Sequence, residues 1–425
     1  MTQRFADVSA WLRSQSVAQE FVAPAYAGGS VGSLAASVLN AFGVDVGTRP
    51  PALLPPIDAK LLNAGSIASA RVLVLLVVDG LGAGVLQRQV ARGGAPGLAG
   101  LGPPAILTSV FPSTTTAALT SIQTGLAPGQ HGMAGYTLNL AATGRVVNMI
   151  TFKPVDGGAF TTAAPDPASM VAGSSLFARL QAAGIPSVVV SHREYADSPL
   201  TRAHSRATPF SGHRTQAEFA TLTLRTVMDA CRARERRFVF AYWAGFDTLA
   251  HSYGPDSATC ALELELLDHA LRVGLLEPLA RLADNVTLLV TADHGLAPLD
   301  PGGVRFQNEI SALTGPWSHP PTGERRALGL ALSDPGGASR LAELVGELGL
   351  VVPVHDAIEA GLYGPQPRHA ELDSRIGNTL LLARHGASFP FRITRDAADV
   401  TTGGAHGSLT PDEMLVPLLA HRFGT

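Results

Sequence analysis

The sequence predicts an α/β protein with a mostly parallel central sheet, helices on both faces of that sheet, and an inserted cap. Short apolar runs rich in β-branched residues recur without alternation, which is typical of strands buried on both faces of a parallel sheet. Segments with helical periodicity lie between these runs, as expected for crossover connections. The 425-residue chain is 46% hydrophobic and only 15% charged, which excludes a disordered protein.

Residues 1–70 are expected to form a helical lead-in followed by an extended wrap, because the segment RPPALLPPI is rich in proline. The start of the chain is charged throughout and lacks the continuous apolar core of a signal peptide. The most apolar run, 72–78, is far shorter than the roughly 20 residues of a membrane-spanning helix. With only two cysteines, Cys231 and Cys260, expected to be reduced, we predict a cytoplasmic protein that binds no membrane.

Residues 71–300 are expected to form the catalytic α/β core. Thr215 with Glu218 three residues later predicts a capping box at the start of one helix. The predicted helices span Ser175–Ala183, Thr215–Arg234 and Ser257–Ala283. The predicted strands span Val72–Val78, Val146–Thr151, Ser187–Val190, Phe238–Tyr242 and Val286–Thr291.

Residues 301–399 break this rhythm, since their apolar runs are short and separated by turns rich in Gly, Pro and Arg. We interpret them as an inserted cap. The core pattern resumes at Met414–Leu419, so residues 400–425 are expected to return to the main sheet. A net charge of −3 gives no basic field for a nucleic-acid polymer, and no motif predicts an oligomeric state.

Acidic and histidine side chains directly follow three of the predicted strands. Parallel strands present their carboxyl ends at one edge of a sheet, where ligands bind. A fourth candidate segment contains His406, which lies just before the last apolar run. Three carboxylates and three imidazoles suit two divalent ions such as zinc or manganese, with three ligands to each. The candidate ligands are Asp79, Asp247, His251, Asp293, His294 and His406.

A nucleophile is expected in TSVFPSTTTAALTSIQTGLAPGQHGMAGY, where a small-residue helix follows the extended FPS. A helix N-terminus has free amide donors and the positive end of the helix dipole, so it binds phosphate. A metal-coordinated hydroxyl placed there becomes a nucleophile at neutral pH. Residue type alone leaves four candidates, Ser113, Thr114, Thr115 and Thr116.

The ordered motifs VVDG, FPSTT, TGLAPGQHG, FDTLAHSYGP, TADHG and GGAHG resemble the alkaline phosphatase superfamily, and more narrowly its type I phosphodiesterase/nucleotide pyrophosphatase family. The resemblance implies an alkaline-phosphatase-like sandwich and a two-metal hydrolase, most often with zinc, whose threonine forms a covalent phosphoryl intermediate. That threonine stands nine residues before the TG string, which selects Thr115. The resemblance further implies two sites, one formed by Asp247, His251 and His406, and the other by Asp79, Asp293, His294 and the Thr115 oxygen.

One position departs from the family pattern. Tyr136 stands where nucleotide pyrophosphatases carry an asparagine that holds a phosphoryl oxygen, and it either packs or donates a hydrogen bond to the phosphate. Between Phe111 and Tyr136 there is no Lys or Arg. An enzyme for dianionic monoesters would be expected to add a guanidinium, so we predict small phosphate diesters or pyrophosphates as substrates. The alternative is that a cation comes from elsewhere in the fold, where Lys153, Arg193 and the cap arginines are available.

Several alternatives remain beside this prediction. A phosphonate hydrolase or a phosphomonoesterase would use the same residues, and a catalytically silent metal-binding protein would belong to a different class. A sulfatase would need a C/S-x-P-x-R string, which is absent, and a cofactor-independent phosphoglycerate mutase would use a different serine motif. Two further groups of residues have a structural and a functional interpretation. His192, His204 and His213 lie in one loop, where we expect solvated side chains, with contact to the substrate as the alternative. His319, Arg325 and Arg326 lie in the cap, where we expect them outside the site, with contact to a leaving group as the alternative.

Overall fold

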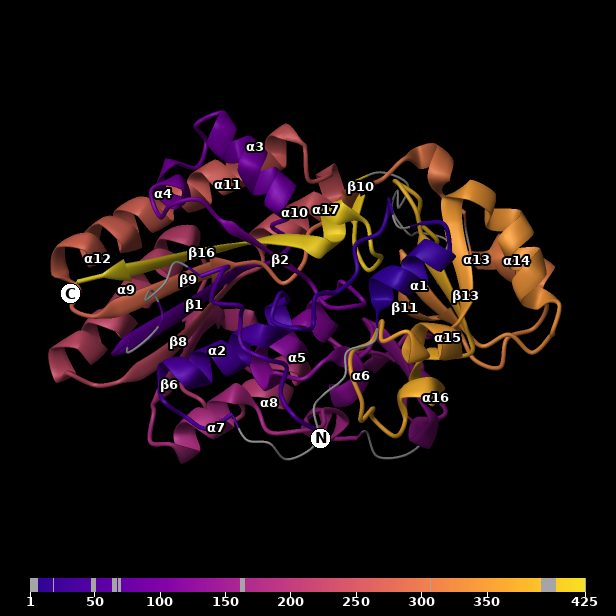
Figure 1. Ribbon diagram of the computed structural model, residues 1–425, viewed down its shortest axis with the longest axis horizontal. Helices are drawn as coiled ribbons and strands as arrows, with labels where there is room; N and C mark the ends of the chain where they lie inside the picture. The colour runs from indigo at the N-terminus through magenta and orange to yellow at the C-terminus, as the bar shows by residue number, and fades with distance from the viewer. Residues whose placement is uncertain are drawn as a thin grey trace.

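The computed structural model describes residues 7–17, 19–46, 51–62, 67, 70–160, 165–305, 307–390 and 403–424. Its centre is a seven-stranded sheet (Figure 1). In spatial order the strands are β2 (Ala105–Thr108), β16 (Leu415–Phe423), β9 (Val286–Thr291), β1 (Val72–Val78), β8 (Arg237–Trp243), β6 (Ser187–His192) and β7 (Phe210–His213).

This main sheet is mostly parallel, as predicted. Strand β1 pairs in parallel with β8 and β9, and β6 pairs in parallel with β7 and β8. Only β16 runs antiparallel to its neighbours, β2 and β9. All residues of β1 and β9 are buried, which explains why these sequences show no alternation.

A second seven-stranded sheet, antiparallel at every pair, lies beside the first (Figure 1). The predicted core strand at 146–151 was wrong, because β4 pairs with β3 and β5 in this second sheet. A short β-branched run shows that a strand is buried but not which sheet it joins. The strands are β13 (Gly349–Pro353), β14 (Thr379–Ala383), β12 (Ala327–Leu330), β11 (Thr322–Glu324), β3 (Thr137–Leu140), β4 (Arg145–Asn148) and β5 (Lys153–Pro154).

Helices cover both faces of the main sheet, which confirms the predicted α/β class (Figure 1). One layer contains α3 (Ala83–Ala91), α4 (Pro96–Ala99), α9 (Gln216–Ala233), α11 (Ala258–Leu271) and α12 (Glu277–Leu282). The other contains α2 (Leu34–Ala41), α5 (Thr115–Thr124), α7 (Leu176–Ala182) and α8 (Pro199–Ser205). A π-helical turn at Arg272–Leu276 joins α11 to α12, within the single helix expected from the sequence.

The cap at the start of α9 differs from the predicted box in one bond. The Thr215 side chain accepts the Glu218 N–H at 3.2 Å, as predicted. The Glu218 carboxylate, however, accepts the N–H of Arg214 at 2.7 Å rather than that of Thr215. The helix therefore begins where the sequence indicates, and its glutamate reaches one residue further back.

Residues 301–399, which we expected to form a cap, supply four strands of the second sheet and most of the helices that pack on it. Helices α13 (Gln307–Thr314) and α14 (Gly337–Val345) pack on one face, and α1 (Val8–Ser14), α15 (Val354–Glu359) and α16 (Leu372–Ile376) pack on the other. Residues 137–154 belong to the same sheet although they precede the predicted cap by more than 140 positions. The boundary predicted at 399/400 lies outside the described residues.

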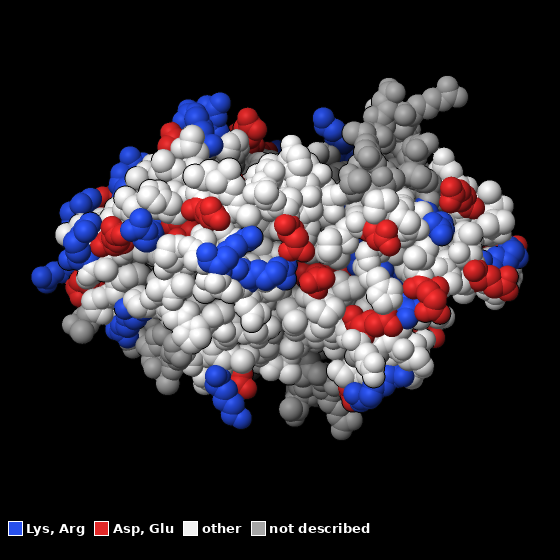
Figure 2. All heavy atoms as spheres, turned by 90° about the horizontal axis from the view of Figure 1, so that it is seen from above, with Lys and Arg blue, Asp and Glu red and all other residues white. Residues whose placement is uncertain are grey.

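Two further observations concern the helices and the surface of the described residues. Among the described helices, none is long and apolar enough to cross a membrane. Figure 2 shows the face seen from above, where Lys and Arg are interspersed with Asp and Glu over the described surface and form no continuous basic stripe.

Candidate active site

The central strands bring three carboxylates to one edge of the main sheet. Val78 of β1 is paired with Trp243 of β8, and Val77 with Thr291 of β9, so the carboxyl ends of these strands are level. Asp79 follows β1 directly, Asp247 lies in the first turn of α10 (Gly245–Tyr253), and Asp293 follows β9. Gly80 has a φ of +75°, and a Cβ there would lie 3.0 Å from the Cβ of Asp247, so this close approach requires glycine.

His406 reaches the same edge from far along the chain. The two-residue strand β15 (Gly404–Ala405) pairs antiparallel with β10 (Ala297–Pro298), which follows β9 by a short loop. An isolated bridge between Ser113 and Gly407 holds the other side of this segment. His406 is thereby fixed between the β9 loop and the start of α5.

The six predicted ligands form two groups of three, and within each group the ligand atoms lie within 4.8 Å of one another. In the first, Oδ1 of Asp247 lies 3.5 Å from Nε2 of His251 and 3.9 Å from Nε2 of His406. In the second, Nε2 of His294 lies 3.5 Å from Oδ1 of Asp79 and 3.6 Å from Oδ2 of Asp293. The rings of His294 and His406 stack at 3.9 Å, so the two groups adjoin.

The donor atoms in these groups suit divalent cations. Within the described chain, Oδ1 of Asp79, Oδ1 of Asp247 and Oδ2 of Asp293 are buried without a hydrogen-bond partner, an arrangement that is costly unless a cation binds there. Nδ1 of each of the three histidines lies 2.9 to 3.1 Å from a backbone carbonyl oxygen, which orients Nε2 toward the carboxylates. Such a set of oxygen and imidazole donors fits zinc or manganese.

The pKa shifts of the candidate ligands also favour the binding of cations. Burial, followed by repulsion from Asp293 and Asp247, raises the pKa of Asp79 well above its usual range. Burial and the Asp247 charge raise the pKa of Asp293 to about 7. Burial lowers the pKa of His251 and, more strongly, that of His406, which keeps both imidazoles neutral. Bound cations would relieve the repulsion among the carboxylates, and neutral imidazoles are the form that binds metal.

Of the four candidate hydroxyls, only Thr115 faces the ligand groups. Its Oγ1 lies 3.1 Å from Nε2 of His294, at the first residue of α5. Ser113 donates to the Ser408 carbonyl at 2.7 Å and Thr116 to the Gly135 carbonyl at 2.9 Å. Thr114 donates to the carboxyl group of Glu324 at 2.5 Å. The helix end therefore presents one hydroxyl to the candidate metal ligands.

A cavity of about 710 Å³, the main cavity, opens beside Thr115 and the Asp247–His251–His406 group. Tyr136 lines it, so the position that departs from the family pattern faces this space. Burial raises the pKa of Tyr136, which keeps the phenol protonated as a donor.

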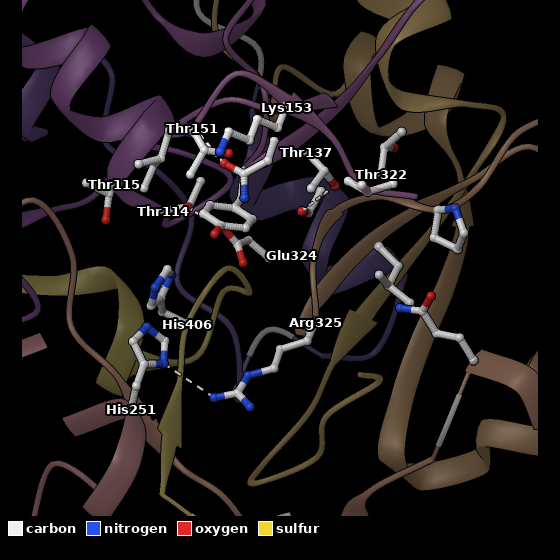
Figure 3. Close-up of a pocket in the computed structure, with 18 of the residues that line it drawn as sticks. Thr114, Thr115, Thr137, Thr151, Lys153, His251, Thr322, Glu324, Arg325 and His406 are labelled. Carbon is white, nitrogen blue, oxygen red and sulfur yellow. Dashed lines mark hydrogen bonds between the residues drawn. The ribbon is translucent and has the colours of Figure 1, made fainter. Parts of the chain in front are cut away.

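The tip of the β11–β12 hairpin reaches into the main cavity from the second sheet. Arg325 points toward His251, with Nη2 3.3 Å from Nδ1, as the dashed line in Figure 3 marks. Glu324 lies beside Thr114, and burial raises its pKa to about 8. Lys153 of β5 also lines the cavity (Figure 3). The second sheet thus adds two cations and a carboxyl group to the site.

Three expectations about other side chains were wrong. His204 and His213 are buried rather than solvated; His204 lies 2.8 Å from the Thr120 hydroxyl. Arg325 was expected to lie outside the site but lines the main cavity. Arg326 was correctly placed outside it, and forms a buried two-bond ion pair with Glu413 at 2.8 and 2.9 Å. His319 also does not line the main cavity.

Sequence reasoning missed Tyr242 and Glu324. Tyr242 lies near the end of β8 and donates to Oδ2 of Asp79, leaving Oδ1 free. The apolar run FVFAY contains this tyrosine, but nothing in that run indicates which neighbour its hydroxyl meets. Glu324 carries no motif at all, since only the pairing of β11 with β3 and β12 brings it to Thr114.

Solved structures with the same fold include two kinds of enzyme. Murine ectonucleotide pyrophosphatase/phosphodiesterase 5, in an inactive form bound to AMP, matches with a TM-score of 0.61 and 18% identity over 82% of this chain and 87% of that one. Phosphonoacetate hydrolase from Sinorhizobium meliloti, bound to phosphonoformate, matches with a TM-score of 0.59 and 19% identity over 83% of this chain and 91% of that one. At these identities the likeness shows the fold.

The sequence itself provides the family assignment. A search of curated proteins found no match. The model of the type I phosphodiesterase/nucleotide pyrophosphatase family matches residues 73–409, which contain every predicted ligand and Thr115. The chain therefore belongs to the type I phosphodiesterase/nucleotide pyrophosphatase family of hydrolases.

Proposed function

We propose that the protein is a metal-dependent hydrolase of small phosphate diesters or pyrophosphates, acting through a covalent phosphoryl intermediate on Thr115. One observation carries this proposal: three buried carboxylate oxygens without partners and three oriented imidazole nitrogens converge beside the Thr115 hydroxyl. The family assignment supports the reaction class.

Asp247, His251 and His406 would hold one divalent ion, and Asp79, Asp293 and His294 the other, with zinc favoured and manganese as the alternative. When bound, such ions neutralise charge on the phosphoryl group and lower the pKa of a nearby hydroxyl. The groups that fix these ligands in place are the backbone carbonyls at Nδ1 of each histidine and the Tyr242 hydroxyl at Asp79.

Thr115 acts as the nucleophile. Its Oγ1 gives up its proton to solvent and forms a bond to phosphorus while the bond to the leaving alcohol or phosphate breaks, and that group takes up a proton from solvent. Water later cleaves the Oγ1–phosphorus bond, which restores the Thr115 hydroxyl and releases the phosphate product. The free N–H groups at the start of α5 face the phosphoryl oxygens, and Tyr136 donates a further hydrogen bond from the main cavity. The substrate is a small molecule, and we place the reaction in the cytoplasm without a nucleic-acid or membrane partner.

We propose diesters or pyrophosphates over monoesters because the segment from Phe111 to Tyr136 contains no Lys or Arg. Lys153 and Arg325 enter the main cavity from the second sheet instead. There they suit a second anionic group of the substrate, such as the next phosphate of a pyrophosphate.

A phosphonate hydrolase is the second candidate. The same two cations would bind the carboxylate of a phosphonocarboxylate, and one structural neighbour is a phosphonoacetate hydrolase. Phosphonoacetate and bis-p-nitrophenyl phosphate, compared on metal-saturated protein, distinguish the two candidates by their kcat/KM values. The monoester p-nitrophenyl phosphate is the third substrate. If its kcat/KM exceeds that of both other compounds by tenfold or more, about 1.4 kcal/mol in activation free energy, both candidate functions are contradicted.

The decisive experiment concerns Thr115. Thr115→Ala should keep two bound ions by elemental analysis and lose several orders of magnitude in turnover of bis-p-nitrophenyl phosphate, whereas Thr115→Ser should keep more. Thr114→Ala and Thr116→Ala are the matched controls and should remain active. Full activity of Thr115→Ala, or of protein stripped of metal by a chelator, would refute the proposal.

A further inference from the structure

A second cavity, the side cavity, borders the main cavity at the candidate nucleophile. It has a volume of about 200 Å³, and Thr115, Ile150 and Asp247 line both cavities. The two spaces therefore meet at the point where Thr115 would hold phosphorus. A phosphodiester has two substituents on phosphorus, and this arrangement offers a separate space to each.

The walls of the side cavity differ in chemistry from those of the main cavity. Leu119 of α5, Val189 of β6, Leu200 of α8 and Phe240 of β8 supply apolar surface. Among the described residues that line it, the ionisable carboxylates are Asp79 and Asp247, both candidate metal ligands, and none is Lys or Arg. Burial lowers the pKa of His204, another lining residue, to about 4, so this ring is neutral at pH 7.

Apart from the candidate metal ligands Asp79 and Asp247, one described residue of the wall has a buried polar atom without a partner. Gln123, on the same face of α5 as Leu119, is only 5% exposed, and its Oε1 has no hydrogen-bond partner in the described chain. A buried amide oxygen without a partner costs free energy, which a ligand donor would recover. Apolar cavities of about 150 Å³ are large enough to hold benzene, so 200 Å³ accommodates a six-membered ring with one further group.

We propose that the side cavity binds one substituent of the phosphodiester, an uncharged ring-sized group that carries a hydrogen-bond donor for Gln123. This inference rests on the proposed phosphodiesterase function and names the class of substrate. The charged part of the substrate remains with the candidate metal ligands and the cations of the main cavity. Leu119 and Leu200 then limit the size of the ring, and Gln123 selects for its donor.

The size of the cavity is tested by filling it from two different helices, with Leu119→Trp and Leu200→Trp. Both variants should lower kcat/KM for methyl p-nitrophenyl phosphate tenfold or more, while the inhibition constant of dimethyl phosphate, which has no ring, changes less than twofold. Leu262→Trp is the matched control, since Leu262 is 55% exposed on α11, and it should behave as wild type. Unchanged kcat/KM in both filled variants, or a parallel loss of dimethyl phosphate binding, would overturn the assignment.

The role of Gln123 is tested with inhibitors. Methyl phenyl phosphate and its three hydroxyphenyl analogues are compared on wild type and on Gln123→Leu, which keeps a similar volume. At least one hydroxyl analogue should inhibit wild type threefold or more tightly than the phenyl compound, and Gln123→Leu should abolish this difference. Equal inhibition of wild type by the phenyl and hydroxyphenyl compounds, or a preference for a hydroxyphenyl compound that remains in Gln123→Leu, would refute the proposed hydrogen bond to Gln123. If metal-saturated wild type hydrolyses no diester, the proposed function itself fails; if it does and the filled variants are unaffected, only the cavity assignment fails.

Discussion

Replacing Tyr242 by phenylalanine tests whether the Asp79 group is a metal site. The Tyr242 hydroxyl donates to Oδ2 of Asp79, and both side chains are buried. The substitution removes one oxygen atom and leaves the ring in place. Asp79 then loses the bond that orients its free Oδ1 toward His294.

The expected magnitude follows from this bond. A hydrogen bond to a charged group contributes about 1.5–3 kcal/mol, and each 1.4 kcal/mol is about tenfold in a dissociation constant. The Tyr242 bond also lowers the pKa of Asp79 against the larger effect of burial, so its loss lets protons compete better with metal. We therefore expect zinc affinity at this site to fall about 10- to 100-fold, the usual effect of removing a partner of a metal ligand.

Zinc affinity should be measured by competition with a chromophoric chelator at pH 7.5. Tyr253→Phe is the matched control, because Tyr253 is 60% exposed on α10 and should bind zinc as wild type does. Turnover by Tyr242→Phe should recover at high zinc concentration, since the substitution weakens the site without removing a ligand. Zinc affinity equal to that of wild type would refute the reasoning.

Three further predictions follow from the same structure. Because the raised pKa of Asp293, about 7, leaves this carboxyl protonated at lower pH, zinc affinity should fall about fivefold from pH 7 to pH 6. Calorimetry in two buffers of different ionisation enthalpy should detect the released proton; pH-independent binding would contradict this. Arg326→Met leaves the buried Glu413 carboxylate without its counter-charge and should lower the free energy of unfolding in urea by about 3–5 kcal/mol, and adding Glu413→Leu should recover part of that loss. Asp79→Asn and His406→Ala should each leave one bound ion by elemental analysis, because they lie in different ligand groups; two ions in either variant would show that the groups are drawn wrongly.

The sequence was sufficient for the central strands of the main sheet and for the residues gathered at its edge, whereas β2 and β7 were not predicted. Val72–Val78 and Val286–Thr291 are strands with the predicted bounds, because a continuous β-branched run is a local property of a strand buried on both faces. Asp79 and Asp293 follow those strands, and parallel strands end at a common edge. These side chains could therefore be expected to meet without any knowledge of the pairing order.

The tertiary structure decided what depends on contacts between distant segments. Residues 146–151 were predicted to be a strand of the main sheet, yet β4 belongs to the second sheet. A run of buried residues predicts a strand but not the strand with which it pairs. Among four neighbouring hydroxyls, residue type could not separate Thr115 from Thr114. Their different partners, His294 and Glu324, lie 179 and 210 positions further along the chain. These hydrogen-bond partners depend on how whole helices and strands pack against one another. A single sequence is enough to predict many of the helices and strands, but not which of them come into contact.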